Sequence, residues 1–247
     1  MLNFGFYNMD CMQGMKEFPD KYFDLAIVDP PYGIGADKFN NGAGAKDHSG
    51  GSTAKRLRVN YGNGKLKNRI LNRSDCSWDA KKPDKEYFDE LIRVSKNQII
   101  WGGNYFDLRP TRGIIIWDKV QPWENFSQVE MAWSSFDKPA SLFRYSNTTS
   151  ANPEHIGKIH PTQKPTALYE WLLSKYAMPD DVILDTHVGS ASSLIACHRT
   201  GHKFVGFEID KNYYKQAKKR LDAEMQQINI FDYMKERNEN GTQLTLF

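Results

Sequence analysis

Short apolar runs alternate with longer amphipathic segments along most of the chain. The apolar runs have the length of buried strands, which we expect over 23–28, 98–101, 113–117, 129–136, 141–145, 182–184 and 203–207, with 129–136 and 141–145 as a late strand pair. Apolar residues recur with helical spacing over 84–96, where Tyr87, Phe88, Leu91 and Ile92 share a face, and over 164–177, 190–199 and 211–227. Strands that alternate with helices predict an α/β fold, with one mostly parallel sheet and helices on both faces.

The composition is that of a globular protein without membrane-spanning segments. The chain has 247 residues, of which 40% are hydrophobic and 26% charged, values typical of a soluble globular protein. No internal repeat is found, and we expect a single domain over 1–235 followed by a flexible tail over 236–247. No apolar stretch approaches the roughly 18 residues of a membrane helix, and the N-terminal segment has no features of a secretory signal. A membrane location is therefore not expected.

The metal-binding and thiol residues are scattered. Cys11, Cys76 and Cys197 lie far apart and form no CxxC motif, which argues against a disulfide framework and favours a reducing cytoplasm. The six histidines form no HxxxH or HExxH pattern. We therefore expect no metal site.

Charge is concentrated in one segment. Residues 36–75 contain nine basic and three acidic side chains, six glycines and few large apolar residues, so we expect a long basic loop. A basic loop on a mildly acidic body points to a polyanion, most simply nucleic acid, although a solvated linker would carry the same charge. The residues we expect to bind DNA are Lys38, Lys55, Arg56, Arg58, Lys65, Lys67, Arg69 and Arg73.

The residues that follow the expected strands carry the candidate chemistry, because ligands of α/β sheets bind at the carboxyl ends of strands. Directly after the strand at 23–28 stand Asp29, Pro30, Pro31 and Tyr32. Prolines stiffen a turn and leave its carbonyls free to accept hydrogen bonds. Together with the Asp29 carboxylate and the Tyr32 ring, these acceptors suit a planar ring with an exocyclic amino group. The alternative is a rigid turn that only ends the strand.

A second turn follows the strand at 182–184, where Asp185 precedes Gly189, Ser190 and the start of a helix. Glycine allows close approach of a ligand, and a helix N-terminus favours a carboxylate. Glu208 ends the next strand, about where a βαβ unit binds ribose hydroxyls. Because no GxGxxG motif is present, an adenosyl ligand without pyrophosphate fits better than a dinucleotide.

A third segment, HPTQKP at 160–165, precedes a predicted helix. Thr162 is expected to cap that helix, and Lys164 offers a charge for a carboxylate. On its own, this segment could be a plain helix start.

The order of these motifs resembles the S-adenosylmethionine-dependent DNA amino-methyltransferases, in the permuted group where the DPPY turn precedes the glycine turn. The segments NMDC, IIWGGNYF, IIIWDK and EMAWSSF also look like that family. The resemblance implies a Rossmann-like methyltransferase sheet and S-adenosylmethionine as the cofactor. It implies that the DPPY turn holds a flipped-out base. The residues it places at the cofactor are Asp10, Cys11, Asp29, Thr162, Lys164, Asp185, His187, Gly189, Ser190 and Glu208.

Within that set the resemblance implies distinct contacts: Glu208 with the ribose, Asp10 and Cys11 near the adenine, and Thr162 and Lys164 with the methionine carboxylate. Two positions depart from the family pattern. His187 replaces an aromatic residue and Ala191 replaces a second glycine. We expect altered cofactor affinity and retained activity, with His187 stacking like the aromatic residue or titrating.

The implied reaction is methylation of adenine N6 in double-stranded DNA. Cytosine N4, a base in RNA, and a module that binds cofactor or DNA without turnover are the alternatives. Asp29 favours adenine, because the family's cytosine enzymes more often have Ser at that position. Target bases would be read by the basic loop and by a short segment over 137–158, which is rich in Ser, Thr and Asn.

The chain ends in a short apolar string, Gln243, Leu244, Thr245, Leu246 and Phe247. It resembles the peptide by which bacterial proteins bind the replication sliding clamp, so the clamp is an expected partner through Gln243, Leu244, Leu246 and Phe247. A homodimer is also expected, because dimers are common in the resembled family.

Overall fold

The computed structural model describes residues 1–34, 79, 81–121, 127–146 and 158–239, with side chains up to residue 227 in the last helix. Its elements follow one another as β1 (Gly5–Tyr7), α1 (Cys11–Met15), β2 (Phe23–Val28), α3 (Lys85–Val94), β3 (Ser95–Trp101), η2 (Gly103–Tyr105), β4 (Ile115–Asp118), β5 (Val129–Ser134), β6 (Ser141–Arg144), α4 (Thr166–Tyr176), β7 (Val182–Asp185), α5 (Ser192–Arg199), β8 (Lys203–Phe207) and α6 (Lys211–Glu239).

The strands form one eight-stranded sheet in the order β1-β8-β7-β2-β3-β5-β4-β6. From β1 to β3 every neighbouring pair is parallel, whereas β5 runs antiparallel to both β3 and β4, and β6 is parallel to β4. The prediction of an α/β fold with a mostly parallel sheet is confirmed.

The pairing expected between 129–136 and 141–145 is wrong, because β4 lies between β5 and β6. β4 pairs antiparallel with β5 along one edge and parallel with β6 along the other. The Trp117 indole Nε1 also donates to the carbonyl of Tyr145, 2.9 Å away, and so holds the segment after β6 against β4.

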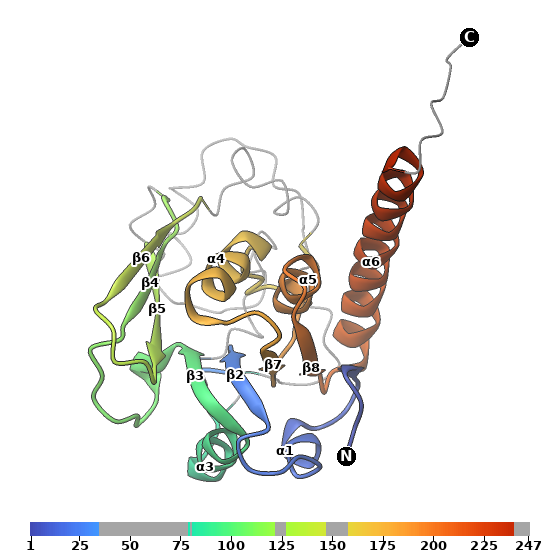
Figure 1. The fold of residues 1–247 in the computed structure, drawn as a ribbon. Helices are drawn as coiled ribbons and strands as arrows, with labels where there is room; N and C mark the ends of the chain where they lie inside the picture. Colours follow the sequence, from blue (N-terminus) through green and yellow to red (C-terminus); the bar gives the residue numbers. More distant parts are fainter. Residues whose placement is uncertain (35–78, 80, 122–126, 147–157, 240–247) are drawn as a thin grey trace, which may run out of the picture.

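Helices cover both faces of the sheet (Figure 1). On one face α4 and α5 supply Leu168, Leu172 and Ala196, which pack on Leu25 and Ile27 of β2. On the other face α1 and α3 bury Met15, Tyr87, Leu91 and Val94 against Ala26 and Val28 of the same strand. Because successive residues of a strand point to opposite faces, the apolar run Leu25–Val28 of β2 is buried on both sides of the sheet, and β2 lies at the centre of the fold.

The expected apolar face of the 84–96 helix is partly wrong. Tyr87 and Leu91 are buried as predicted, but Ile92 is exposed and Val94 is buried in its place. The helix ends at Val94 and β3 begins at once, with the Ser95 hydroxyl donating to the carbonyl of Leu91 at 2.5 Å. The direct junction shortens the helix and rotates its buried face.

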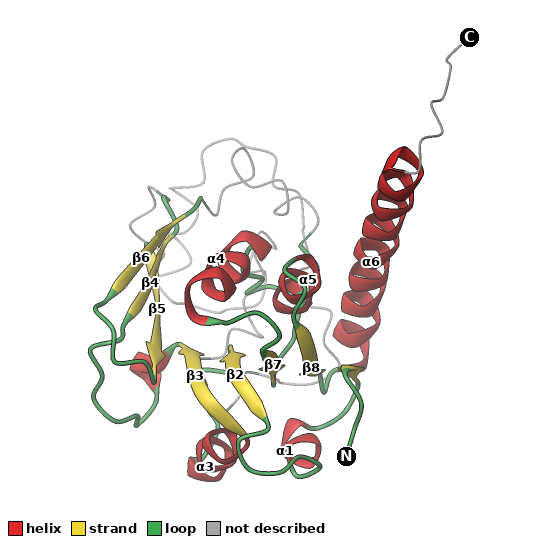
Figure 2. Cartoon of the chain, viewed as in Figure 1, coloured by secondary structure: helices red, strands yellow, loops and turns green. Residues whose placement is uncertain are grey.

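Both ends of the chain contain structure that the hydrophobic pattern did not predict. β1 has three residues and α1 has five, each too short for a periodic signal, and Asp10 caps α1 by accepting from the amides of Met12 and Gln13. At the other end, α6 runs to Glu239 past α5 (Figure 2). The tail expected from residue 236 therefore begins inside a helix. Among the residues described, no helix has the length and apolar character to cross a bilayer.

Candidate active site

The turn after β2 brings two donors to one carboxylate. The Tyr32 hydroxyl donates to Asp29 Oδ1 at 2.5 Å, and the Lys164 ammonium donates to Asp29 Oδ2 at 2.5 Å. Lys164 comes from the segment before α4, 135 residues along the chain. The structure thus joins the predicted DPPY turn with the predicted HPTQKP segment.

Lys164 is buried and belongs to a chain of charges. Its ammonium nitrogen lies 3.0 Å from Glu130 Oε2 and 3.4 Å from the Tyr32 hydroxyl, and the other Glu130 oxygen lies 2.6 Å from Lys119 Nζ. Asp29, Glu130 and the Tyr32 hydroxyl can thus accept all three ammonium hydrogens. The predicted contact of Lys164 with a methionine carboxylate stays a prediction.

The chain of charges fixes the ionisation of its members. Burial alone would lower the pKa of Lys164, but Asp29 and Glu130 outweigh it and raise the pKa above its usual value. Burial would likewise raise the pKa of Glu130, but Lys164 and Lys119 lower it to about 2. At neutral pH Lys164 is therefore an ammonium and Glu130 a carboxylate.

The Tyr32 ring has two close neighbours, Tyr105 and Gly102. The ring of Tyr105, at the end of η2, stacks on it with centroids 4.9 Å apart and planes 11° apart. Gly102 lies against the ring as well, because a Cβ built there would come within 2.2 Å of Tyr32 Cε1. Gly102 has a φ of +68°, which favours glycine for a second reason. The backbone at Gly102 cannot move aside easily, whereas the Tyr105 side chain is exposed.

The glycine turn after β7 is held by two buried carboxyl groups. Asp185 Oδ1 accepts from the amide of His187 at 2.9 Å, and its Oδ2 accepts from the hydroxyl of Ser193. Glu208 Oε2 accepts from the amide of Gly189 at 2.8 Å. Burial raises the pKa of Asp185 and of Glu208 to about 7 each.

Ala191 has a φ of +64° and a fully buried side chain. The backbone therefore keeps the left-handed conformation that a glycine would adopt at this position. Its methyl group packs among Val188, Leu194 and Ile195, next to Leu221 of α6. The substitution is thus accommodated by the core beneath the turn.

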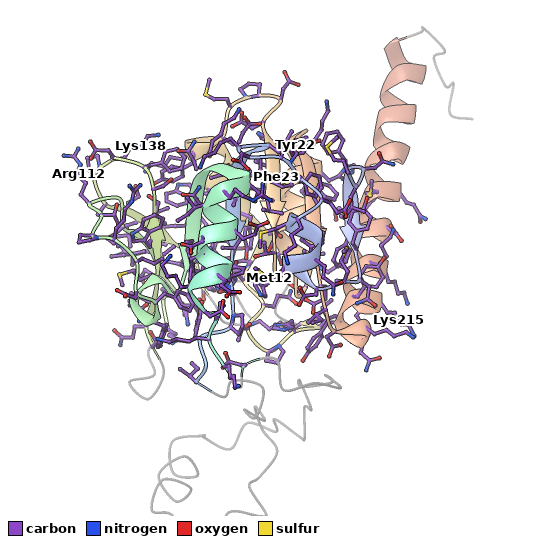
Figure 3. All side chains as sticks on the ribbon, turned by 90° about the horizontal axis from the view of Figure 1, so that it is seen from below. Met12, Tyr22, Phe23, Arg112, Lys138 and Lys215 are labelled. Carbon is purple, nitrogen blue, oxygen red and sulfur yellow. The ribbon has the colours of Figure 1, made fainter. Side chains whose placement is uncertain are left out.

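A cavity of about 350 Å³ lies beside these turns. Its walls come from α1, the DPPY turn, the start of α3 and the glycine turn, through Cys11, Met12, Pro31, Lys81, Lys82, Pro83, Asp84, Tyr87 and His187. Met12 is labelled in Figure 3. Burial lowers the pKa of His187 to about 4, so the ring is neutral at pH 7. The His187 ring meets the Tyr87 ring edge-on, with centroids 5.4 Å apart. The expectation that His187 stacks like the aromatic residue it replaces stays a prediction.

Other predicted site residues have structural partners in this chain. The Asp10 carboxylate caps α1, and burial raises the pKa of the neighbouring Cys11 thiol to about 12. The Ser190 carbonyl accepts from Arg220 of α6 at 2.8 Å. The expected cap by Thr162 is wrong, because α4 begins at Thr166 with Pro165 in the cap position, and the Thr162 hydroxyl lies 3.1 Å from His160 Nδ1 instead.

Several predictions fall outside the described residues. They include the eight basic residues of the 36–75 loop, residues 147–157 of the proposed reading segment, and the clamp-like tail at 243–247. Within the described part of the chain, no cluster of three metal-ligating side chains is present.

Three site residues were missed by sequence reasoning: Lys119, Glu130 and Tyr105. Glu130 lies in the strand expected over 129–136, and Lys119 lies two residues after the strand expected over 113–117. Only their polar character beside an apolar run could have marked them. Tyr105 lies after the strand expected over 98–101, in a segment for which no helix or strand was expected. The contacts of these residues depend on pairing between strands, which periodicity does not show.

The chain is similar in sequence to known DNA methylases. A family model described as DNA methylase, for the N6/N4 group, matches residues 97–219. Type II methyltransferase M2.DpnII of Streptococcus pneumoniae is 43% identical over 156 residues, which cover 63% of this chain and 52% of that protein. Type II methyltransferase M.HpaI of Haemophilus parainfluenzae is 36% identical over 99 residues, covering 40% of this chain and 30% of that protein. The matches thus span about half, or less, of these relatives.

The fold has counterparts among solved structures. The crystal structure of the M1.HpyAVI–SAM complex superposes with a TM-score of 0.51 at 19% identity, over 87% of this chain and 98% of that one. At this level of identity the likeness concerns the fold.

Proposed function

We propose that this chain, which belongs to the N6/N4 family of S-adenosylmethionine-dependent DNA amino-methyltransferases, methylates N6 of an adenine flipped out of double-stranded DNA. One observation carries the proposal. The DPPY turn follows β2, the glycine turn follows β7, and these two strands pair directly through Leu25 with Ile183 and Ala26 with Leu184. An acceptor site and a cofactor site on neighbouring parallel strands open at the same edge of the sheet.

The residues of the glycine turn fit S-adenosylmethionine. A cavity of about 350 Å³ is large enough for a small ligand, and its walls include the apolar faces of Pro31 and Tyr87. The buried Glu208 carboxyl group has acceptor capacity for ribose hydroxyls beside the bond it receives from Gly189. Gly189 and Ser190 would line the ligand where the backbone approaches it. When bound, the cofactor supplies an electrophilic methyl group.

The DPPY turn fits the acceptor amine. An adenine amino group would donate one hydrogen to Asp29 and the other to the carbonyl of Pro30, while Tyr32 stacks on the ring. These bonds favour a tetrahedral nitrogen and direct its lone pair at the methyl group. Transfer would then be an in-line displacement: the amine nitrogen would bond to the methyl carbon as the sulfur–carbon bond breaks and the neutral thioether leaves, with positioning and electrostatics supplying most of the acceleration. The amine would lose its proton to solvent only after it has gained the methyl group.

The acceptor is tested by mass spectrometry of nucleosides from host DNA, with and without expression of this chain. We expect N6-methyladenine. Detection of N4-methylcytosine instead would keep the family and overturn the acceptor, because cytosine N4 presents the same geometry to Asp29 and Pro30. Absence of both, with S-adenosylmethionine bound by the purified protein, would support an RNA acceptor or a module without turnover.

The remaining partners are proposed on the sequence. The basic residues of the 36–75 loop would contact DNA phosphates and help to offset the few kcal/mol that base flipping costs. The last five residues would bind the sliding clamp, and deletion of residues 243–247 should then abolish binding to purified clamp. Unchanged binding would refute that role.

A further inference from the structure

We infer that Glu130 is a positioning residue of the proposed methyl transfer: it holds the Lys164 ammonium between two carboxylates, so that Asp29 keeps a fixed orientation with acceptor capacity left for the substrate amine. The inference rests on the proposed function. Glu130 lies on β5, and among the described residues its carboxylate pairs with Lys119 and Lys164.

The contacts give Glu130 a defined effect on Asp29. Lys164 Nζ lies 2.5 Å from Asp29 Oδ2 and 3.0 Å from Glu130 Oε2, so one ammonium serves two acids. If Glu130 lost its charge, Lys164 would be left with Asp29 as its single close carboxylate. The ammonium would then be drawn onto the oxygens that the amine must reach.

Lys119 completes the arrangement from the other side. Its ammonium lies 2.6 Å from Glu130 Oε1, and its side chain is 12% exposed. Each of the two Glu130 oxygens therefore has its own ammonium partner. Lys119 limits how strongly Glu130 attracts Lys164, because the two ammonium groups share one carboxylate.

The protonation of Lys164 reports on this arrangement independently of catalysis. The titratable groups around the Lys164 ammonium come from several elements. The acids are Asp29 after β2, Glu130 on β5 and Asp185 at the end of β7. Tyr32 after β2 and His160 in the segment of Lys164 are neutral. Only Glu130 and Asp29 among the acids lie within 4 Å of Lys164 Nζ in the described structure.

The experiment compares Glu130→Gln, which keeps the shape of the side chain, with Lys119→Gln and with the control Glu90→Gln. Glu90 is a partly buried glutamate paired with Arg93 on α3, outside the site. The titration of the Lys164 ammonium is followed by nitrogen-15 NMR of lysine side chains. In parallel, methyl transfer at saturating DNA is measured as a function of pH, with KM for S-adenosylmethionine.

We expect Glu130→Gln to lower the pH at which Lys164 titrates by about one unit or more, and Lys119→Gln to raise it. In Glu130→Gln the alkaline limb of kcat should move to lower pH and kcat should fall about tenfold, while KM for the cofactor stays within about twofold. Glu90→Gln should leave every curve in place.

The inference is overturned if Lys164 titrates at the wild-type pH in Glu130→Gln, or if the control variant shifts equally. Should Glu130→Gln fail to fold, Lys119→Gln provides the test: a higher titration pH for Lys164 supports the inference, and an unchanged or lower one overturns it. A Lys164 shift in a protein that methylates no DNA would refute the proposed function and leave the electrostatic coupling established. Normal methylation without a shift would refute the coupling alone.

Discussion

At the scale of single residues, the position of the Tyr32 ring depends on the lack of a side chain at Gly102. Gly102 and Gly201 both have positive φ, +68° and +77°, but a Cβ at Gly201 would meet nothing within 4 Å, whereas one at Gly102 would run into the Tyr32 ring. The two positions therefore separate backbone strain from a clash in the site.

Gly201→Ala should cost about 1–2 kcal/mol of unfolding free energy, the strain of a left-handed alanine, and leave methyl transfer intact. Gly102→Ala should cost at least as much and lower methyl transfer by an order of magnitude or more, because Tyr32 must move. Urea denaturation and methylation assays on both variants check this. Equal activity losses would show that the strain and not the Tyr32 contact matters.

The Asp29 carboxylate accepts from Tyr32 and Lys164, and we propose that it also accepts from the substrate amine. We expect Asp29→Ala to abolish turnover and to leave S-adenosylmethionine binding largely intact, because the cavity walls other than the DPPY turn remain. Calorimetric titration of the cofactor and a methylation assay measure the two properties. Asp89→Ala, which removes an exposed carboxylate paired with Lys85, is the control. Loss of cofactor binding and turnover together in a folded Asp29→Ala protein would contradict this division of roles.

At the scale of elements, Glu208 connects the end of β8 with three other segments. It follows β8 directly, its own amide donates to the carbonyl of Tyr7 in β1, and its carboxyl group accepts from Gly189 before α5 and from Asp210 before α6. Burial raises the pKa of this carboxyl group to about 7. The stability of the junction between these elements should therefore depend on whether the Glu208 carboxyl group is protonated.

The sign of the coupling follows from the two states. An unfolded glutamate releases its proton near pH 4.3, whereas folded Glu208 keeps it to about pH 7, so the folded state binds more protons between these values. Stability is therefore highest at the acidic end of this window and falls as pH rises to 7, on the order of 1–3 kcal/mol for this group. Asp185 contributes in the same direction.

Glu208→Gln should flatten that decline, and the exposed-site control Glu86→Gln should not. Denaturant unfolding at several pH values between 5 and 8 measures the slope for each protein. A slope unchanged in Glu208→Gln would contradict a raised pKa at this junction.

The hydrophobic pattern predicted the central elements and much of the site, for a physical reason. β2, β7 and β8 are buried apolar runs whose polar residues stand only at their ends, so both strands and strand-end turns stand out. β1 was missed because it is three residues long, and the β5–β4–β6 order because pairing is a long-range property. Glu130 was missed for the same reason: its partners Lys164 and Lys119 reach it through folding alone.

At the scale of the whole molecule, the charge asymmetry predicts how DNA is held. If the basic loop contacts phosphates, binding should fall steeply with salt, with a slope of about −0.9 per phosphate on logarithmic axes. Replacing Lys65, Lys67 and Arg69 by alanine should reduce that slope by up to about 3. Fluorescence anisotropy with labelled duplex at several salt concentrations measures it.

A matched triple variant uses the exposed lysines Lys16, Lys85 and Lys215, which lie outside the loop. Its salt slope should equal that of the unaltered protein. If both triple variants change the slope equally, attraction is spread over the whole surface and the loop has no special part.

The cluster around Asp29, unlike the basic loop, contains equal numbers of basic and acidic side chains. Two lysines, Lys119 and Lys164, face two acids, Glu130 and Asp29, so the cluster that we propose as the base site has as many basic as acidic groups. In the proposed reaction a neutral base leaves the stack and enters a pocket with balanced charges, so no counterions are released or taken up in that step. Ionic strength should then govern how long the duplex stays attached, while the rate at which an attached duplex delivers its base is nearly independent of salt.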